Sequence, residues 1–187
     1  MNWATMANTR SQFSDKSRLR ESIRERLKEL SEGERHTRSV RICETLGRLF
    51  CGKNSLGLFA PTPAEPDLDL LWGLGLLENH LISYPWCKDG VLSFCSVLSL
   101  SQLIPGRFGI REPAPGPKPE QLDLIVVPGL AFTAEGSRLG RGAGFYDRFL
   151  SSVPHSTVKI GVCFEFQCLS EIPQKSHDVK MDAVVCA

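Results

Sequence analysis

The sequence predicts a single α/β domain with a mainly parallel sheet flanked by helices, a Rossmann-like three-layer arrangement. Helical and short apolar stretches alternate along the chain, which is typical of domains built on a parallel sheet. Residues 122–127 are apolar apart from Asp123, as expected for a strand covered on both faces. The length of 187 residues suits one domain with one sizeable core. We expect this domain to span residues 14–187.

Helices dominate the expected first third of the domain. Residues 1–13 are polar, and we expect a flexible leader there. A first helix is expected from Ser14 or Asp15 to residue 30, with Leu19, Ile23, Leu27 and Leu30 on one stripe. The spacing of Ser31 and Glu34 is that of a capping box, which predicts that a second helix begins there.

Strands and shorter helices are expected in the remainder. We expect strands at 55–60, 81–84, 91–97, 122–127, 158–164 and 183–186, and helices at 67–77 and 145–152. Pro61 and Pro85 are expected to end the first two strands, because proline cannot donate to a sheet ladder. Residues 108–121 contain four prolines and are expected to form a loop.

Composition narrows the class of protein. The net charge is +1, which gives no bulk reason to expect a nucleic acid or an anionic membrane as partner. No apolar run reaches the roughly 18–20 residues that cross a bilayer. We therefore expect a cytoplasmic location by default. We also expect a monomer that acts on small molecules. The seven cysteines contain no CxxC pair, so we expect buried or inert thiols rather than a zinc site or disulfides.

A glycine–arginine loop is the most informative segment. Gly140, Gly142 and Gly144 alternate just before an expected helix, and such glycines let backbone N–H groups turn toward an anion. Arg138 and Arg141 can each donate two parallel hydrogen bonds to phosphate oxygens. The spacing matches neither a P-loop nor the dinucleotide fingerprint. The segment predicts a phosphate cradle, and a tight turn without a ligand is the alternative.

Residues 122–132 (LDLIVVPGLAF) and 138–148 (RLGRGAGFYDR) closely resemble the signature of the 5-formyltetrahydrofolate cyclo-ligase family. The resemblance continues in residues 16–20, 108–113 and 177–182. It implies that residues 14–187 form one cyclo-ligase domain, which uses ATP and Mg²⁺ to convert 5-formyltetrahydrofolate to 5,10-methenyltetrahydrofolate with release of ADP and phosphate. Phe145 stands where many members have tyrosine, and Glu65–Leu68 lacks a threonine that is often found there.

The resemblance also implies roles for individual residues. Catalytic roles fall on Lys16, Arg138 and Arg141. ATP contacts fall on Lys16, Arg20, Arg138, Leu139, Gly140, Arg141, Gly142, Ala143, Gly144, Phe145 and Tyr146. Folate contacts fall on Ala60, Glu65, Phe108, Arg141, Gly142, Ala143, Gly144 and Phe145. Magnesium ligation falls on Asp147 and Asp182, in agreement with the preference of Mg²⁺ for one or two carboxylates plus phosphates.

Without the resemblance, the same residues can also have purely structural roles. Lys16 and Arg20 are four apart on a helix that is charged all along, and such mixtures usually form a solvated face. Asp147 near a helix start can simply favour the helix dipole. Two other functions also remain open: a sugar-phosphate isomerase or CoA-transferase on a similar scaffold, and a non-catalytic protein that binds folate or nucleotide.

Overall fold

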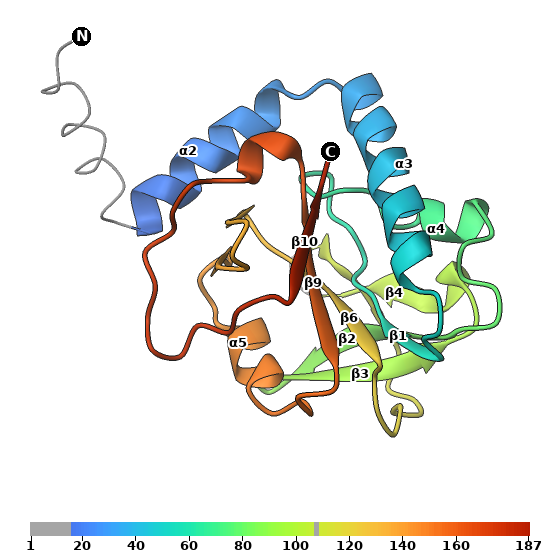
Figure 1. Ribbon diagram of the computed structural model, residues 1–187. Coiled ribbons are helices and arrows are strands. Elements are labelled where there is room, and N and C mark those ends of the chain that lie inside the picture. Colours follow the sequence, from blue (N-terminus) through green and yellow to red (C-terminus); the bar gives the residue numbers. More distant parts are fainter. Residues whose placement is uncertain (1–15, 107–108) are drawn as a thin grey trace, which may run out of the picture.

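A computed structural model of the protein describes residues 16–106 and 109–187. Its centre is a six-stranded sheet in the order β10-β9-β6-β1-β2-β3 (Figure 1). The strands are β1 (Ser55–Gly57), β2 (Leu81–Lys88), β3 (Val91–Val97), β6 (Leu124–Pro128), β9 (Val158–Cys163) and β10 (Ala183–Cys186). Every neighbouring pair is parallel except the β2–β3 hairpin. The mainly parallel sheet is therefore confirmed. The expected leader, the first helix cap and Phe108 lie outside the described residues.

The first two helices form as predicted. They are α2 (Lys16–Glu29) and α3 (Glu32–Leu49). The Glu34 N–H donates to Ser31 Oγ at 3.3 Å, and the Ser31 N–H donates back to Glu34 Oε2 at 3.2 Å, which completes the capping box. Leu19, Ile23 and Leu27 of α2 are buried. The apolar stripe of α2 thus faces the core.

Strand β6 shows why the domain has three layers. Leu124 and Val126 pack in the core cluster that includes the buried faces of α2 and α3, whereas Ile125 and Val127 pack with Leu150 of α5 (Phe145–Leu150). Successive side chains of a strand point to opposite faces, so both faces of β6 are covered. Figure 1 shows α3 and α4 (Leu70–Gly73) on one side of the sheet and α5 on the other. None of the helices in the described ranges combines the length and apolar character needed to span a membrane.

Several of the predicted elements differ in length. The strand expected at 55–60 is shorter, because β1 ends at Gly57. The helix expected at 67–77 is only one turn, α4, and Gly75 beyond it has a left-handed φ of 68°. The strand expected to end at Pro85 continues to Lys88. Ser83 O accepts from the Leu58 N–H, and polar groups of alternate residues in a strand point the same way. The missing N–H of Pro85 therefore faces the β1 side, beyond the end of β1, and disrupts no pairing with β3.

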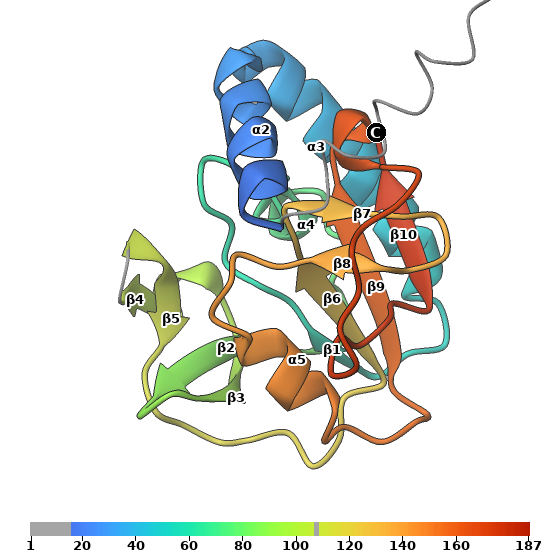
Figure 2. The ribbon, with the colours of Figure 1, turned by 90° about the vertical axis from the view of Figure 1, so that its left-hand side faces the viewer.

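The segment expected to be a loop at 108–121 contains a strand. β5 (Arg111–Pro113) pairs antiparallel with β4 (Leu103–Pro105). Figure 2 shows this hairpin next to the β2–β3 hairpin. Its prolines stand at strand ends, where a missing donor is tolerated. The expectation of a loop throughout this segment was wrong. Three residues are enough to form a strand when a second short strand, here β4, lies beside them.

The cysteines form no disulfide. All seven lie in the described part of the chain, and none is joined to another by a disulfide bond. Cys43, Cys95 and Cys163 are buried, whereas Cys51 and Cys186 are exposed. Burial raises the pKa of the Cys43 thiol to about 12, so this thiol stays protonated near neutral pH. The prediction of buried thiols therefore holds for some of the seven and not for all.

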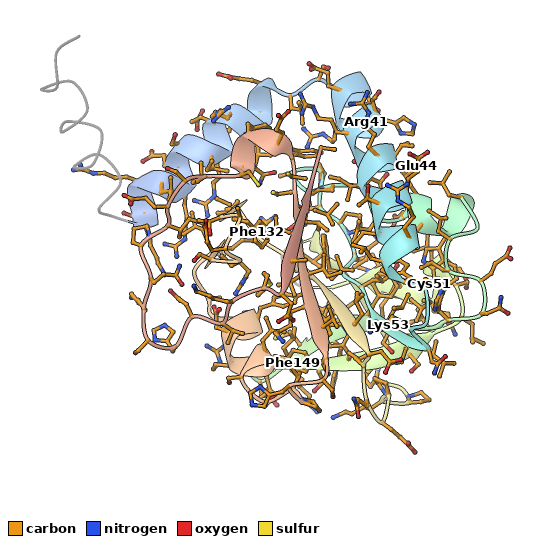
Figure 3. All side chains as sticks on the ribbon, viewed as in Figure 1. Arg41, Glu44, Cys51, Lys53, Phe132 and Phe149 are labelled. Atoms are coloured by element: carbon orange, nitrogen blue, oxygen red, sulfur yellow. The ribbon has the colours of Figure 1, made fainter. Side chains whose placement is uncertain are left out.

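Phe132 fills the space between the sheet and the chain that leads to the glycine loop. The residue lies in β7 (Ala131–Phe132), its side chain is fully buried, and Figure 3 shows it in the interior. A Cβ added at Gly161 of β9 would collide with the Phe132 ring. Gly161 is therefore required by the close approach of this ring.

Gly161→Ala is expected to lower the free energy of unfolding by about 1–3 kcal/mol, because it overpacks the contact with Phe132. Gly33→Ala is the matched control, since a Cβ at this first-turn position of α3 meets nothing within 4 Å. The control is expected to be neutral or to stabilise by up to about 1 kcal/mol. Urea unfolding followed by circular dichroism measures both, and equal stability of the two variants would contradict the packing argument.

Candidate active site

A cavity of about 270 Å³ opens at the carboxyl ends of the central strands. Phe59 and Ala60 follow β1, Pro128 ends β6, and all three line the cavity. This edge is where ligands bind in open α/β sheets. The cavity brings together most of the predicted site residues: Lys16, Arg20, Ala60, Glu65, Arg138, Gly140, Arg141, Gly142, Ala143, Gly144, Phe145, Tyr146 and Asp147.

The glycine loop forms one wall of the cavity. Gly142 has a φ of 117° and Gly144 a φ of 68°, conformations that residues with a Cβ rarely adopt. Arg20 of α2 donates from Nε to the carbonyl oxygen of Gly140 at 2.9 Å. α2 therefore reaches the loop across 120 residues of sequence, and Figure 2 shows α2 lying above β7 and β8 (Arg138–Leu139).

Arg138 is a fixed, buried cation at the start of the loop. It donates from Nη1 to the carbonyl oxygen of Pro128 at 3.1 Å and from Nη2 to Asp147 Oδ1 at 2.8 Å. The side chains of Arg138 and Asp147 are only 5% and 17% exposed. The ion pair thus joins the two ends of the loop to the end of β6. Leu139 does not line the cavity; it is buried in the core behind it.

Arg141 and Glu65 form an ion pair in the wall of the cavity. Arg141 Nη2 lies 2.8 Å from Glu65 Oε1 and donates to Thr62 Oγ1 at 3.0 Å. Glu65 Oε2 accepts from the Thr62 N–H at 2.9 Å and from the Thr62 hydroxyl at 2.8 Å. Glu65 is buried, whereas the Arg141 side chain is 45% exposed. The predicted folate contact and the predicted phosphate contact are therefore direct neighbours.

Lys16 pairs with a carboxylate that the sequence did not single out. Its Nζ lies 2.6 Å from Asp178 Oδ2, which also accepts from the Lys175 N–H at 2.7 Å. Burial raises the pKa of Asp178, but the hydrogen bonds from Lys16 and Lys175 outweigh it and leave the pKa below its ordinary value. Asp178, Lys175 and His177 all line the cavity. The place of His177 and Asp178 in the 177–182 motif was the available signal.

Tyr146 lines the cavity, but its hydroxyl is buried and has no hydrogen-bond partner among the described residues. Its ring centre lies 5.7 Å from the Arg138 guanidinium carbon. Burial is the main cause that raises the pKa of this phenol, and the charge of Glu65 adds to it, whereas Arg138 opposes it. The group therefore stays protonated near neutral pH. The ring of the neighbouring Phe145 lies 5.2 Å from the Arg148 guanidinium carbon.

Asp182 lies away from the cavity. Its Oδ2 accepts from the Lys159 N–H at 2.7 Å and pairs with Lys159 Nζ at 2.9 Å, just before β10 begins. This is the amino-terminal edge of the parallel strands, opposite the cavity. Within residues 16–106 and 109–187, no three His, Cys, Asp or Glu side chains are placed to hold a metal ion together. A divalent ion at Asp147 would therefore need ligands from a bound substrate.

Comparison with known proteins identifies the family. The model of the 5-formyltetrahydrofolate cyclo-ligase family matches residues 12–187. The chain belongs to this family. A relative named 5-formyltetrahydrofolate cyclo-ligase in Mycolicibacterium smegmatis is 31% identical over 179 residues, which cover 91% of this chain and 92% of the relative. The resemblance seen in the glycine–arginine loop is thus confirmed over almost the whole length.

Solved structures of cyclo-ligase relatives share the fold. The NMR structure of the 5,10-methenyltetrahydrofolate synthetase from Aquifex aeolicus is 35% identical, with a TM-score of 0.81 over 91% of this chain and 89% of that one. The synthetase structure from Mycoplasma pneumoniae is 22% identical and has a TM-score of 0.74 over 91% of this chain and 97% of that one. The second comparison supports the fold alone.

The lowered pKa of Asp178 predicts a pH dependence of stability. Because the unfolded chain binds the proton at higher pH, the contribution of Asp178 is present above about pH 4 and is lost as pH falls through the lowered pKa. Asp178→Asn is expected to cost about 1–3 kcal/mol of unfolding free energy at pH 7 and less toward pH 3.

Unfolding curves at several pH values measure this effect. Glu44→Gln is the control, because Glu44 lies on the exposed side of α3 (Figure 3) and is expected to change stability by less than about 0.5 kcal/mol. A difference between Asp178→Asn and the unaltered chain that is the same at pH 3 and pH 7 would show that the Lys16–Asp178 pair does not carry the effect.

Proposed function

We propose that this chain catalyses the ATP- and Mg²⁺-dependent cyclisation of 5-formyltetrahydrofolate to 5,10-methenyltetrahydrofolate, with release of ADP and phosphate. One observation carries the proposal: Glu65, the expected folate contact, lies 2.8 Å from Arg141, the expected phosphate contact, in one cavity. Two ligands bound to these side chains would meet inside the cavity. The reaction needs such a meeting, because the nucleotide must activate an oxygen of the folate.

The chemistry explains why a nucleotide is needed. The formyl group on N5 is amide-like and a poor electrophile, and its oxygen would have to leave as water or hydroxide. In the proposed reaction the formyl oxygen attacks the γ-phosphorus, the bond from phosphorus to ADP breaks, and the formyl carbon becomes iminium-like. N10 then adds to this carbon, the C–O bond breaks, and phosphate leaves with the proton that N10 loses. Closure is intramolecular, so alignment supplies much of the second step.

The side chains supply position and positive charge. Arg138, Arg141, Lys16 and Arg20 surround the glycine loop, and phosphoryl transfer is catalysed mainly by positioning and electrostatic stabilisation. We assign the phosphates to these side chains and to the backbone of Gly140–Gly144. Ala60, Glu65 and Phe145 are assigned to the folate. Phe108 stays a predicted folate contact outside the described residues.

The charge balance of the cavity fits a divalent cation. Among the described residues, five basic and four acidic side chains line it: Lys16, Arg20, Arg138, Arg141 and Lys175, and Glu65, Glu112, Asp147 and Asp178. This near balance leaves little net charge to offset a triphosphate. Asp147 uses Oδ1 for Arg138, so we assign Oδ2 to Mg²⁺, which when bound would neutralise phosphate charge. Asp182 stays a predicted ligand without support from its contacts.

The decisive assay mixes purified protein, Mg-ATP and 5-formyltetrahydrofolate and follows the methenyl chromophore in the near ultraviolet. ATP-dependent appearance of this chromophore together with ADP is the expected result. Binding of both ligands without ADP release would instead indicate a non-catalytic protein, and turnover of sugar phosphates without ATP an isomerase. The cytoplasmic location and the monomeric state stay predictions from composition.

Arg141→Ala is expected to lower kcat by about 100-fold, like other losses of a charge-stabilising donor. The thermal transition should change little, because the Arg141 side chain is 45% exposed. Arg41→Ala is the matched control, since Arg41 projects from α3 away from the cavity (Figure 3). Steady-state kinetics of both variants test this prediction. Full activity of Arg141→Ala would exclude a phosphate role for Arg141.

Asp147→Asn is expected to raise the Mg²⁺ concentration needed for half-maximal rate, because the amide is a weaker ligand for a hard cation. The substitution also weakens the ion pair with the buried Arg138, so thermal unfolding must be measured alongside. A magnesium titration that superimposes on that of the unaltered enzyme would remove Asp147 from the assignment.

A further inference from the structure

Three of the seven cysteines gather at the carboxyl ends of β9 and β10, outside the residues that line the cavity. Cys163 ends β9, Cys186 ends β10, and the two are partners in the register of these parallel strands, which Figure 1 shows side by side. The chain after β9 turns through a short helix at 165–167 and brings Cys168 back, so that the thiols of Cys163 and Cys186 both donate to Cys168 Sγ. Strand register assembles this cluster, so the spacing of the cysteines in the sequence did not reveal it.

The three thiols differ in how far solvent reaches them. Cys163 is buried in the cluster that contains Phe132, and Cys168 packs against the same cluster while it stays partly exposed. Cys186 is exposed. A small reagent in solution can therefore reach Cys168 and Cys186, whereas Cys163 is shielded.

The surroundings of each thiol also decide which one reacts first. Partial burial, the hydrogen bond to Cys168 and the charge of Cys168 raise the pKa of the Cys186 thiol to about 11. Burial and the charge of Cys168 also raise the pKa of the Cys163 thiol. The thiolate is the nucleophile in thiol chemistry, so Cys163 and Cys186 are slow to attack near neutral pH. Cys168 is left as the sulfur that attacks first.

We propose that Cys168 and Cys186 form a site of oxidative modification, at which a hydroperoxide converts the two thiols to a disulfide. The Cys168 sulfur attacks a peroxide oxygen, the O–O bond breaks, and Cys168 becomes a sulfenic acid. With hydrogen peroxide the leaving group departs as water. The Cys186 sulfur then attacks Cys168 Sγ, the S–O bond breaks, and a second water leaves. The two thiols thus lose two electrons and two protons, which the peroxide gains.

This disulfide would act on the wall of the cavity. It would join the two ends of the segment 168–186, and the middle of this segment carries Lys175, His177 and Asp178 to the cavity. Asp178 in turn pairs with Lys16 at 2.6 Å. A cross-link that closes such a loop restricts the unfolded chain and so stabilises the folded one. We therefore expect oxidation to make the folded protein, including this wall of the cavity, more resistant to unfolding.

Peptide mapping of the full chain tests the proposal directly. The purified protein is treated with hydrogen peroxide, its remaining thiols are alkylated, and the digest is analysed by mass spectrometry. We expect a peptide pair linked between Cys168 and Cys186 that separates again in dithiothreitol. We also expect the melting temperature to rise by about 5–10 °C on oxidation and to return on reduction.

Variants separate this pair from the other exposed thiol. Cys186→Ser is expected to abolish the rise in melting temperature, and dimedone added with the peroxide should label the sulfenic acid of Cys168 in this variant. Cys51→Ser is the matched control, because Cys51 is exposed on the turn after α3 (Figure 3) and lies outside the cluster. This control should form the linked peptide and show the same rise as the unaltered chain.

Several results would overturn the proposal. Recovery of Cys168 and Cys186 as alkylated thiols after peroxide treatment would do so, as would a linked peptide that joins a different pair of cysteines. Dimedone on Cys163 rather than Cys168 would contradict the order of attack. Because these readouts use no turnover, they hold or fail independently of the proposed cyclisation.

Discussion

The ion pair between Arg138 and Asp147 is the constraint on which the cavity depends. It joins the residue that begins the glycine loop to the first turn of α5, and the same guanidinium holds the carbonyl oxygen of Pro128 at the end of β6. Losing one partner of a buried pair leaves an uncompensated charge, at a cost of about 3–5 kcal/mol. The glycines between adopt unusual conformations because they have no Cβ, and the ion pair fixes the two ends of their loop to the sheet.

The sequence predicted correctly the features that depend on residues close together in the chain. The capping box at Ser31 and the apolar stripe of α2 depend on neighbours within a few residues, and both are confirmed. The continuation of β2 through Pro85 depends on where the neighbouring strand β1 ends. The β4–β5 hairpin forms because each of its short strands finds the other as a pairing partner. The pair of Lys16 and Asp178 joins positions 162 residues apart. Such contacts are set by the assembled fold, so no local pattern reveals them.

The 177–182 motif shows the limit of carrying roles over from a resemblance. Asp178 and Asp182 both belong to it, yet the chain runs between them from the cavity to the start of β10. Asp178 holds Lys16 beside the glycine loop, whereas Asp182 holds Lys159 at the opposite edge of the sheet. Two carboxylates four residues apart thus serve different ends of the parallel strands, and only the geometry distinguishes them.

The cations expected to bind phosphate already have acceptors within the protein. Lys16 pairs with Asp178, Arg138 with Asp147 and Arg141 with Glu65, and Arg20 holds the Gly140 carbonyl. These contacts fix the positions of the charges, so a triphosphate bound as proposed would have to share or replace them. Arg138 is buried and bonded on two nitrogens, whereas Arg141 is the half-exposed member of its pair. We therefore expect an exchange of partners to be easiest at Arg141, while the buried pair keeps the loop in shape.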